Sequence, residues 1–183
     1  MFTRKMLVAA IAATGLIGAV AHAAEETKRT FGEYTDDTVI LGKVKSALGS
    51  DKTTEANEIN VEVNKGVVQL NGFVDGEKEK AQATVVAQGV KGVKSVENNL
   101  IVKAEKTSTG QSMDDSSITA KVNSALIESK DTKAGDIKVQ TYDGVVQLSG
   151  FVANQAQKDA AGKVAQAVKG VKSVKNDLHV KGT

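Results

Sequence analysis

The sequence predicts an α+β protein of two tandem domains, each running helix, strand, strand, helix, strand. Three observations predict this class: an internal repeat, alternating apolar residues typical of strands, and apolar residues spaced as on helices. Residues 36–103 align with residues 114–181 at a constant offset of 78 without a gap, and 37 of the 68 aligned positions are identical. Two copies of so long a repeat indicate tandem domains rather than a solenoid.

The first element of each domain is expected to be a helix. An apolar stripe at i, i+4, i+7 and i+8 predicts it. The stripe consists of Ile40, Val44, Ala47 and Leu48, repeated as Ile118, Val122, Ala125 and Leu126. Two aspartates precede each stripe: Asp36 and Asp37, then Asp114 and Asp115. Their position predicts helix N-caps, which is a better account than a pair of metal-binding carboxylates.

A hairpin should follow the first helix. Ile59, Val61 and Val63 alternate with polar residues, which is the period of a half-buried strand. The turn is Asn64-Lys65-Gly66 in one copy and Tyr142-Asp143-Gly144 in the other, with a glycine free to adopt positive φ. The second strand is predicted over residues 67–74.

A second helix and a last strand complete each domain. The helical stripe Ala83, Val86, Ala87 and Val90 leads to Gly92, the expected C-cap, and Val96, Leu100 and Val102 share one face of the last strand. Two helices should cover one face of a three-stranded mixed sheet. Eight residues are expected to be structural: Gly66, Gly72, Gly92, Gly144, Gly150, Gly170, Asn98 and Asn176. The two asparagines should face the core and bond a neighbouring loop backbone.

The other face of each sheet is the place to look for binding. If Val68, Leu70 and Val74 face the helices, Val67, Gln69 and Phe73 point away, unless a bulge at Gly72 or Gly150 reverses the phase. The apolar members of this face are Val67, Phe73, Val145 and Phe151. Domains of this size are marginal alone, so the copies should pack together or bind something. The face could serve clients or the domain contact.

The remaining segments indicate export. Arg4 and Lys5, an apolar run and the sequence Ala21-His22-Ala23 predict a signal peptide over residues 1–23, cleaved before Ala24. An uncleaved anchor is the alternative. Residues 24–35 should form a flexible tail and residues 104–113 a polar linker. The mature protein is therefore expected to be exported.

Composition excludes several functions. With no cysteine there is no thiolate nucleophile and no cysteine metal site. After cleavage His179 is the one histidine, and its place in an alternating strand predicts a solvent-facing residue. Loss of Arg4 and Lys5 leaves basic and acidic residues equal in number, which argues against nucleic acid. We therefore expect no enzyme activity, no metal and no cofactor.

The repeated motif resembles the BON domain. Its two parts are Gly66 to Val74 with Val90 to Val102, and Gly144 to Val152 with Val168 to Val180. The resemblance implies an αββαβ fold, a Gram-negative periplasmic location and a role in envelope or osmotic stress. It also implies binding of anionic phospholipid or of unfolded clients.

Two functional hypotheses follow. The first is a non-catalytic holdase-type chaperone for non-native or outer-membrane polypeptides. The second is an adaptor that binds anionic phospholipid at the membrane surface, weakly and peripherally, through lysines that flank a glycine: Lys91, Lys94, Lys169 and Lys172. These lysines could instead only complement a helix C-terminus. A structural spacer without ligands is the third possibility. The second copy carries the more positive net charge, which slightly favours it as the anion-facing domain.

Overall fold

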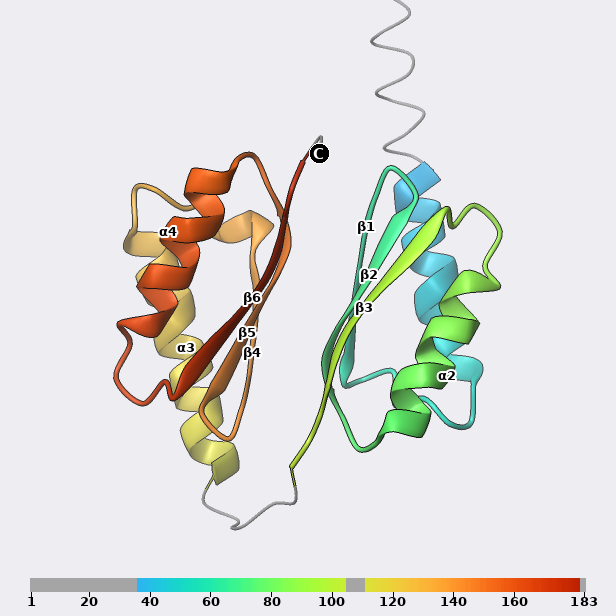
Figure 1. Ribbon diagram of the computed structural model, residues 1–183, viewed down its shortest axis with the longest axis horizontal. Helices are drawn as coiled ribbons and strands as arrows, with labels where there is room; N and C mark the ends of the chain where they lie inside the picture. Colours follow the sequence, from blue (N-terminus) through green and yellow to red (C-terminus); the bar gives the residue numbers. More distant parts are fainter. Residues whose placement is uncertain (1–35, 105–110, 182–183) are drawn as a thin grey trace, which may run out of the picture.

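The computed structural model describes residues 36–104 and 111–181, which form two α+β domains with their sheets facing each other (Figure 1). The first domain holds a helix over residues 36–50, then β1 (Ile59–Asn64), β2 (Val67–Val74), α2 (Glu77–Gln88) and β3 (Ser95–Val102). The second holds α3 (Gln111–Glu128), η1 (Ala134–Asp136), β4 (Lys138–Tyr142), β5 (Val145–Val152), α4 (Gln155–Gln166) and β6 (Ser173–Val180). The predicted fold class is confirmed. The predicted signal peptide, tail and most of the linker lie outside the described residues.

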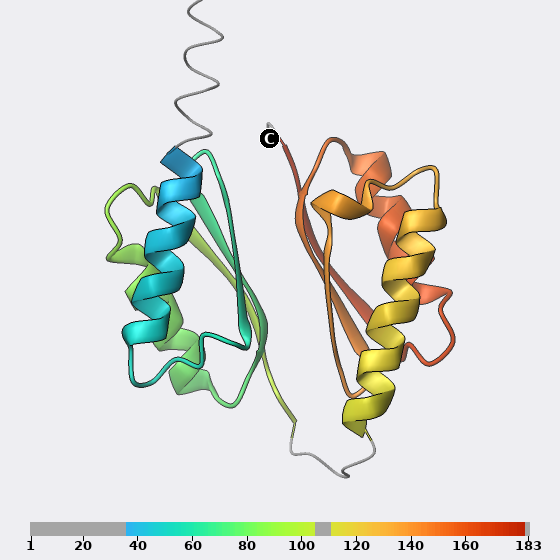
Figure 2. The ribbon, with the colours of Figure 1, turned by 180° about the vertical axis from the view of Figure 1, so that it is seen from behind.

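Each domain contains one mixed three-stranded sheet. In the first, the central strand β2 pairs antiparallel with β1 and parallel with β3. The second sheet repeats this arrangement with β5 at its centre. The parallel pair requires a crossover, which α2 and α4 provide. The helices of each domain cover the face of its sheet that points away from the other domain (Figure 2).

The hairpin turns are two-residue turns at which glycine is needed. Asn64 pairs with Val67, so Lys65 and Gly66 alone close the loop, with φ of 53° and 82°. Positive φ at both central residues defines the turn type whose twist suits a hairpin. Asp143 and Gly144 repeat it with φ of 48° and 72°.

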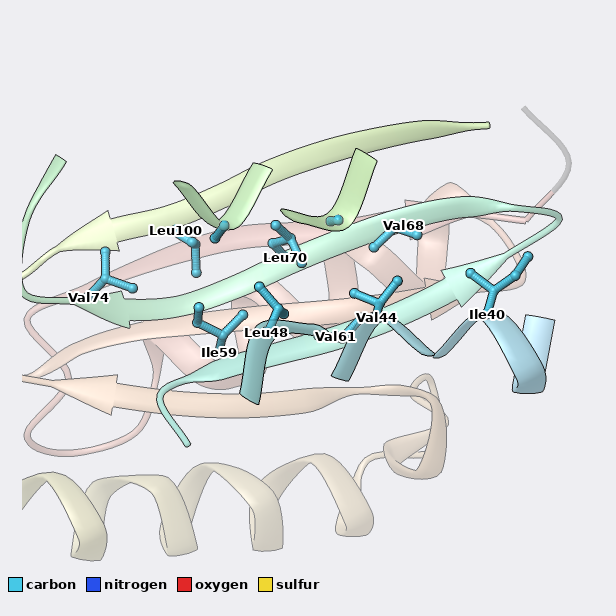
Figure 3. Packing of buried hydrophobic residues seen from close by; sticks show 11 residues of the cluster. Ile40, Val44, Leu48, Ile59, Val61, Val68, Leu70, Val74 and Leu100 are labelled. Atoms are coloured by element: carbon cyan, nitrogen blue, oxygen red, sulfur yellow. The ribbon is translucent and has the colours of Figure 1, made fainter. Parts of the chain in front are cut away.

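Each domain has its own hydrophobic core between helices and sheet. In the first domain the first helix and β2 contribute most of it (Figure 3). Val68, Leu70 and Val74 are fully buried there, so the predicted phase of β2 is confirmed. No bulge at Gly72 reverses this phase, because the parallel register with β3 continues through it to Val74. The φ of Gly72 is 139°, and a Cβ on it would lie 2.1 Å from the carbonyl oxygen of Glu58.

Two structural predictions need correction. Helix α2 ends at Gln88 with Gly89 as its C-cap, so Gly92 is not the cap. Gly92 instead turns the chain with φ of 105° and lies against the first helix, where a Cβ would come within 3.0 Å of Ile40 Cγ1. Glycine permits both the positive φ and the close packing.

The asparagines bond helices rather than loops. Asn98 Nδ2 donates to the Lys80 carbonyl and to Thr84 Oγ1, both at 2.6 Å, and so ties β3 to α2. Asn176 Nδ2 donates to the Lys158 carbonyl of α4 at 2.7 Å. Half-buried amides thus find partners, as buried polar groups must.

Candidate functional site: two lysine-lined hollows

Each domain carries a hollow where three segments meet: the start of its first helix, its hairpin turn, and the turn before its last strand. The hollow measures about 340 Å³ in the first domain and about 380 Å³ in the second. Equivalent residues line both, so the repeat has produced the same site twice. We call them hollow 1 and hollow 2.

An aspartate from the helix fixes the hairpin turn at each hollow. The Asp37 carboxylate accepts hydrogen bonds from the backbone N–H groups of Lys65 and Gly66, at 2.6 and 2.8 Å. Asp115 accepts from Asp143 and Gly144 N–H, both at 2.8 Å. Charged acceptors make the stronger hydrogen bonds. The predicted N-cap role of these two aspartates is wrong, because α3 already begins at Gln111 and Asp115 lies within the helix.

The glycine turns join the remaining wall of each hollow. The Lys94 N–H donates to the Gly66 carbonyl at 2.9 Å, and the Lys172 N–H donates to the Gly144 carbonyl at 2.8 Å. The stem of each lysine lies over the turn glycine, where a Cβ would come within 3.0 Å of Lys94 Cγ. Backbone bonds therefore position these lysines at the rim.

The four lysines predicted as phosphate contacts divide evenly between the hollows. Lys91 and Lys94 line hollow 1, and Lys169 and Lys172 line hollow 2. Further lysines join them from elements distant in sequence. These are Lys43 and Lys65 in hollow 1, and Lys121 in hollow 2. All seven lysines are exposed, so their ammonium groups can contact an anion while they keep part of their hydration.

The hollows differ at two equivalent positions. Hollow 1 has Lys65 where hollow 2 has Asp143, and Asp143 forms an ion pair with Lys172 at 2.5 Å. Hollow 1 also has Val39, 47% exposed, where hollow 2 has Ser117. Four lysines and two aspartates line hollow 1, against three of each in hollow 2. Hollow 1 is therefore the more basic, contrary to the net charges of the domains.

The predicted apolar face lies in the contact between the domains. Phe73 is 7% exposed and its ring lies 5.5 Å from that of Tyr142 in the other domain. Val67, Val145 and Phe151 are half-buried. The expectation that the copies pack together therefore holds, and the face does not present Phe73 to solvent while the domains touch.

Two glutamines at the centre of this contact bond across it. Gln147 is 1% exposed; its Oε1 accepts from Gly72 N–H and its Nε2 donates to the Asn99 carbonyl, both at 2.8 Å. Gln69 is fully buried and its Nε2 lies 3.5 Å from the Asp177 carbonyl. Both glutamines thus contact main-chain atoms of the opposite sheet. These contacts therefore depend little on which side chains the opposite domain carries.

His179 also belongs to the contact. Its Nε2 lies 2.7 Å from Glu97 Oε2 of the first domain, and its side chain is 38% exposed. Its ring lies 6.0 Å from that of Phe151. The prediction of a residue that only faces solvent is wrong, because the other domain covers this strand.

One carboxylate oxygen of Glu62 lacks a hydrogen-bond partner at the contact among the described residues. This oxygen, Oε2, is buried. Burial raises the pKa of Glu62 to about 7; the charges of Lys138 and Lys45 oppose this shift, and Asp136 adds to it. Near pH 7 the Glu62 side chain is therefore protonated in about half of the molecules.

Sequence reasoning missed several of these residues. Lys65 and Lys43 lie far from Lys91 in sequence, and only the fold brings them together. The glycine after Lys65 was a usable signal, because it marks a turn whose other central residue must be exposed. Within residues 36–104 and 111–181, no three His, Cys, Asp or Glu side chains meet as a metal site requires. Nor does any helix in those ranges have the length and apolarity to cross a bilayer.

Comparison with known protein sequences identifies the family. The BON domain family matches residues 36–104 and again 114–182. Osmotically-inducible protein Y of Escherichia coli is 42% identical over 151 residues, 82% of this chain and 75% of that protein. Outer membrane lipoprotein DolP of Haemophilus influenzae is 37% identical over 158 residues, 86% and 81% of the two chains. A 21 kDa hemolysin of Actinobacillus pleuropneumoniae is 36% identical over 147 residues, 80% and 75%. The chain belongs to the BON domain family, with two copies of the domain in tandem.

Proposed function

We propose that this chain is a non-catalytic periplasmic protein of envelope and osmotic stress that binds anionic phospholipid headgroups through hollow 1. The names of two relatives, one osmotically inducible and one an outer membrane lipoprotein, support the cellular setting. The observation that carries the binding proposal is the convergence of four exposed lysines on one hollow.

The chemistry of hollow 1 suits a phosphate at a lipid surface. Lys65, Lys91 and Lys94 offer ammonium donors from two turns, and Val39 adds an exposed apolar side chain at the same rim. A basic residue near an anionic leaflet contributes about 1 kcal/mol. Four lysines against two aspartates, one of which is occupied by the hairpin turn, give weak and reversible association. A peripheral adaptor needs no more.

Co-sedimentation with vesicles tests this proposal. The purified chain is mixed with phosphatidylglycerol vesicles or with phosphatidylcholine vesicles, at low and high salt. Binding is expected only to the anionic vesicles and should fall with salt, because the Debye length shrinks from about 10 Å at 0.1 M to about 3 Å at 1 M. Lys91→Glu with Lys94→Glu should weaken binding more than about tenfold.

The second domain supplies the matched control. Lys169→Glu with Lys172→Glu makes the same charge change at hollow 2, where Asp143 already pairs with Lys172. We expect a smaller loss from this pair. Equal binding to both vesicle types, or a larger loss from the hollow 2 pair, would contradict the assignment to hollow 1.

We also propose a second candidate function, a holdase-type chaperone for non-native or outer-membrane polypeptides. The glutamines favour it, because Gln147 bonds a main-chain N–H and a main-chain carbonyl of the opposite sheet. An extended polypeptide offers the same groups whatever its sequence. Such binding requires the domains to separate, since Phe73 is covered while they touch. The test is light scattering of an unfolded outer-membrane β-barrel protein diluted from urea, and unchanged aggregation at molar excess of this chain would reject the candidate.

A further inference from the structure

We propose that the contact between the two domains is a pH-responsive latch, in which protonated Glu62 keeps the sheets together and its carboxylate form lets them part. The inference goes beyond lipid binding, because the latch lies between the sheets and hollows 1 and 2 lie at the ends of the domains. It determines whether the face around Phe73 is covered or open.

The domains can separate without disturbing either core. Each domain has its own cluster of buried apolar residues, and neither cluster draws on the other domain. The sheets are joined by polar contacts, which are the glutamine bonds to main-chain atoms and the pair between His179 and Glu97, and by the ring contact of Phe73 with Tyr142. Polar contacts between domains resemble those of transient complexes. Water can replace most of them on opening.

Glu62 packs against the backbone of the opposite sheet. A Cβ on Gly150 of the opposite sheet would come within 3.3 Å of Glu62 Oε2. The charged groups that act on it are Lys45 of the first helix, Lys138 of β4 and Asp136 of η1. None of them donates a hydrogen bond to Oε2, which is buried without a partner in the described part of the chain. A buried carboxylate without a donor costs far more free energy than the protonated acid does.

The residue of the second domain that is equivalent to Glu62 is uncharged. Gln140 occupies the equivalent position in the second domain, and its Oε1 lies 3.3 Å from where a Cβ on Gly72 would stand. The two positions are thus packed alike, one with an amide and the other with a titratable acid. Glu62→Gln therefore places at this position the residue that the second domain already has there, Gln140.

The direction of the pH response follows from linkage. In the closed form burial raises the pKa of Glu62 from 4.5 to about 7, so this form binds the proton more tightly than a solvent-exposed glutamate does. The stabilisation of the closed form is complete below pH 4.5 and is lost as pH rises through 7. If opening restores the ordinary value, the ratio of open to closed molecules should rise about tenfold between pH 6 and pH 8, and little beyond.

Single-molecule energy transfer between the domains tests the latch. The chain has no cysteine, so Lys78→Cys in α2 and Ala156→Cys in α4 introduce two exposed and equivalent labelling positions. We expect a low-transfer population whose ratio to the high-transfer population rises about tenfold from pH 6 to pH 8. A ratio that stays constant, including one with no low-transfer population at either pH, overturns the proposal.

Three variants assign the effect to Glu62. Glu62→Gln should reduce the response to less than about twofold, whereas Glu77→Gln, an exposed acid of α2, should leave it unchanged. His179→Ile places the residue of the first domain at the equivalent site and should keep most of the response. A Glu62→Gln chain with the full tenfold response, or loss of the response in His179→Ile alone, overturns the proposal. Circular dichroism establishes that each variant is folded.

Discussion

Hollow 1 and hollow 2 are built on the same three segments and held by the same bonds, yet the residues at two equivalent positions differ in charge and polarity. In both, an aspartate accepts two backbone N–H bonds from the hairpin turn and the turn glycine accepts one from the loop before the last strand. In hollow 1 the turn residue is Lys65, and in hollow 2 it is Asp143, paired with Lys172. The frame is conserved within the chain while its lining varies.

The net charge of a domain is therefore a poor guide to the charge at its hollow. The second domain is the more positive by residue count, but three of its aspartates stand at hollow 2. The first domain is slightly acidic, but its acids lie largely elsewhere and four lysines gather at hollow 1. An ammonium group acts over about a Debye length, so local lining outweighs the domain total.

The largest expected effect tests what the two hollows share. Asp115→Ala should destabilise the second domain by about 3 kcal/mol, because two charge-assisted bonds are lost and the Gly144 N–H is left buried. Asp37→Ala should cost about 2 kcal/mol, since the Lys65 N–H is exposed and water can replace the carboxylate there. Urea unfolding followed by NMR resonances of each domain separates the two effects.

The neighbouring aspartates are the controls for that pair. Asp36→Ala and Asp114→Ala remove exposed carboxylates and should change stability by less than about 0.5 kcal/mol. If Asp36 supplied the important carboxylate as an N-cap, Asp36→Ala would instead cost about 1 kcal/mol. Equal losses from Asp36→Ala and Asp37→Ala would refute the role assigned to Asp37.

Much of the fold could be predicted because it depends on short-range periodicity. The alternation around Val68 and Leu70 determined which face of β2 meets the helices, and the glycine of the hairpin fixed the turn. Asp37 was misread because its partners lie 28 and 29 residues further along the chain. A pattern of neighbouring residues contains no information about partners so far along the chain. The sequence therefore suggested an N-cap role for Asp37, which is wrong.

The candidate site was predicted only in part, for the same reason. The repeated Val-Lys-Gly-Val-Lys motif pointed to lysines that do line the hollows, but the motif carries no information about Lys65 or Lys43. The apolar residues of the domain contact were predicted, but its polar centre was not. Glu62 sits at a polar position of an alternating strand, which is the pattern of a solvent-facing residue, and only the opposite sheet buries it.

The equivalent asparagines of the two domains should contribute unequally to stability. Asn98 donates to two acceptors, the Lys80 carbonyl and Thr84 Oγ1, whereas Gly162 stands in place of that threonine beside Asn176. Asn98→Ala should cost about 2 kcal/mol and Asn176→Ala about 1 kcal/mol. The same NMR-resolved unfolding measures both. A greater loss in the second domain would show that packing against the amide, rather than its hydrogen bonds, sets the cost.

The prediction with the smallest change in free energy bears most directly on function. It exchanges the turn residues by which the two hollows differ. Lys65→Asp gives hollow 1 the turn residue of hollow 2, and Asp143→Lys does the reverse. Both positions have φ near 50°, which lysine and aspartate already adopt there, so the fold should tolerate either exchange. Each exchange changes only one side chain on an unchanged frame.

Lys65→Asp should weaken binding to phosphatidylglycerol vesicles by about fivefold or more, and Asp143→Lys should strengthen it by a similar factor. The double exchange keeps the net charge of the whole chain, so a response governed by total charge would leave its binding unaltered. If the lining governs binding, the double variant should instead become sensitive to Lys169→Glu with Lys172→Glu and insensitive to Lys91→Glu with Lys94→Glu. The site would then have moved from one domain to the other through two substitutions, which net charge cannot explain.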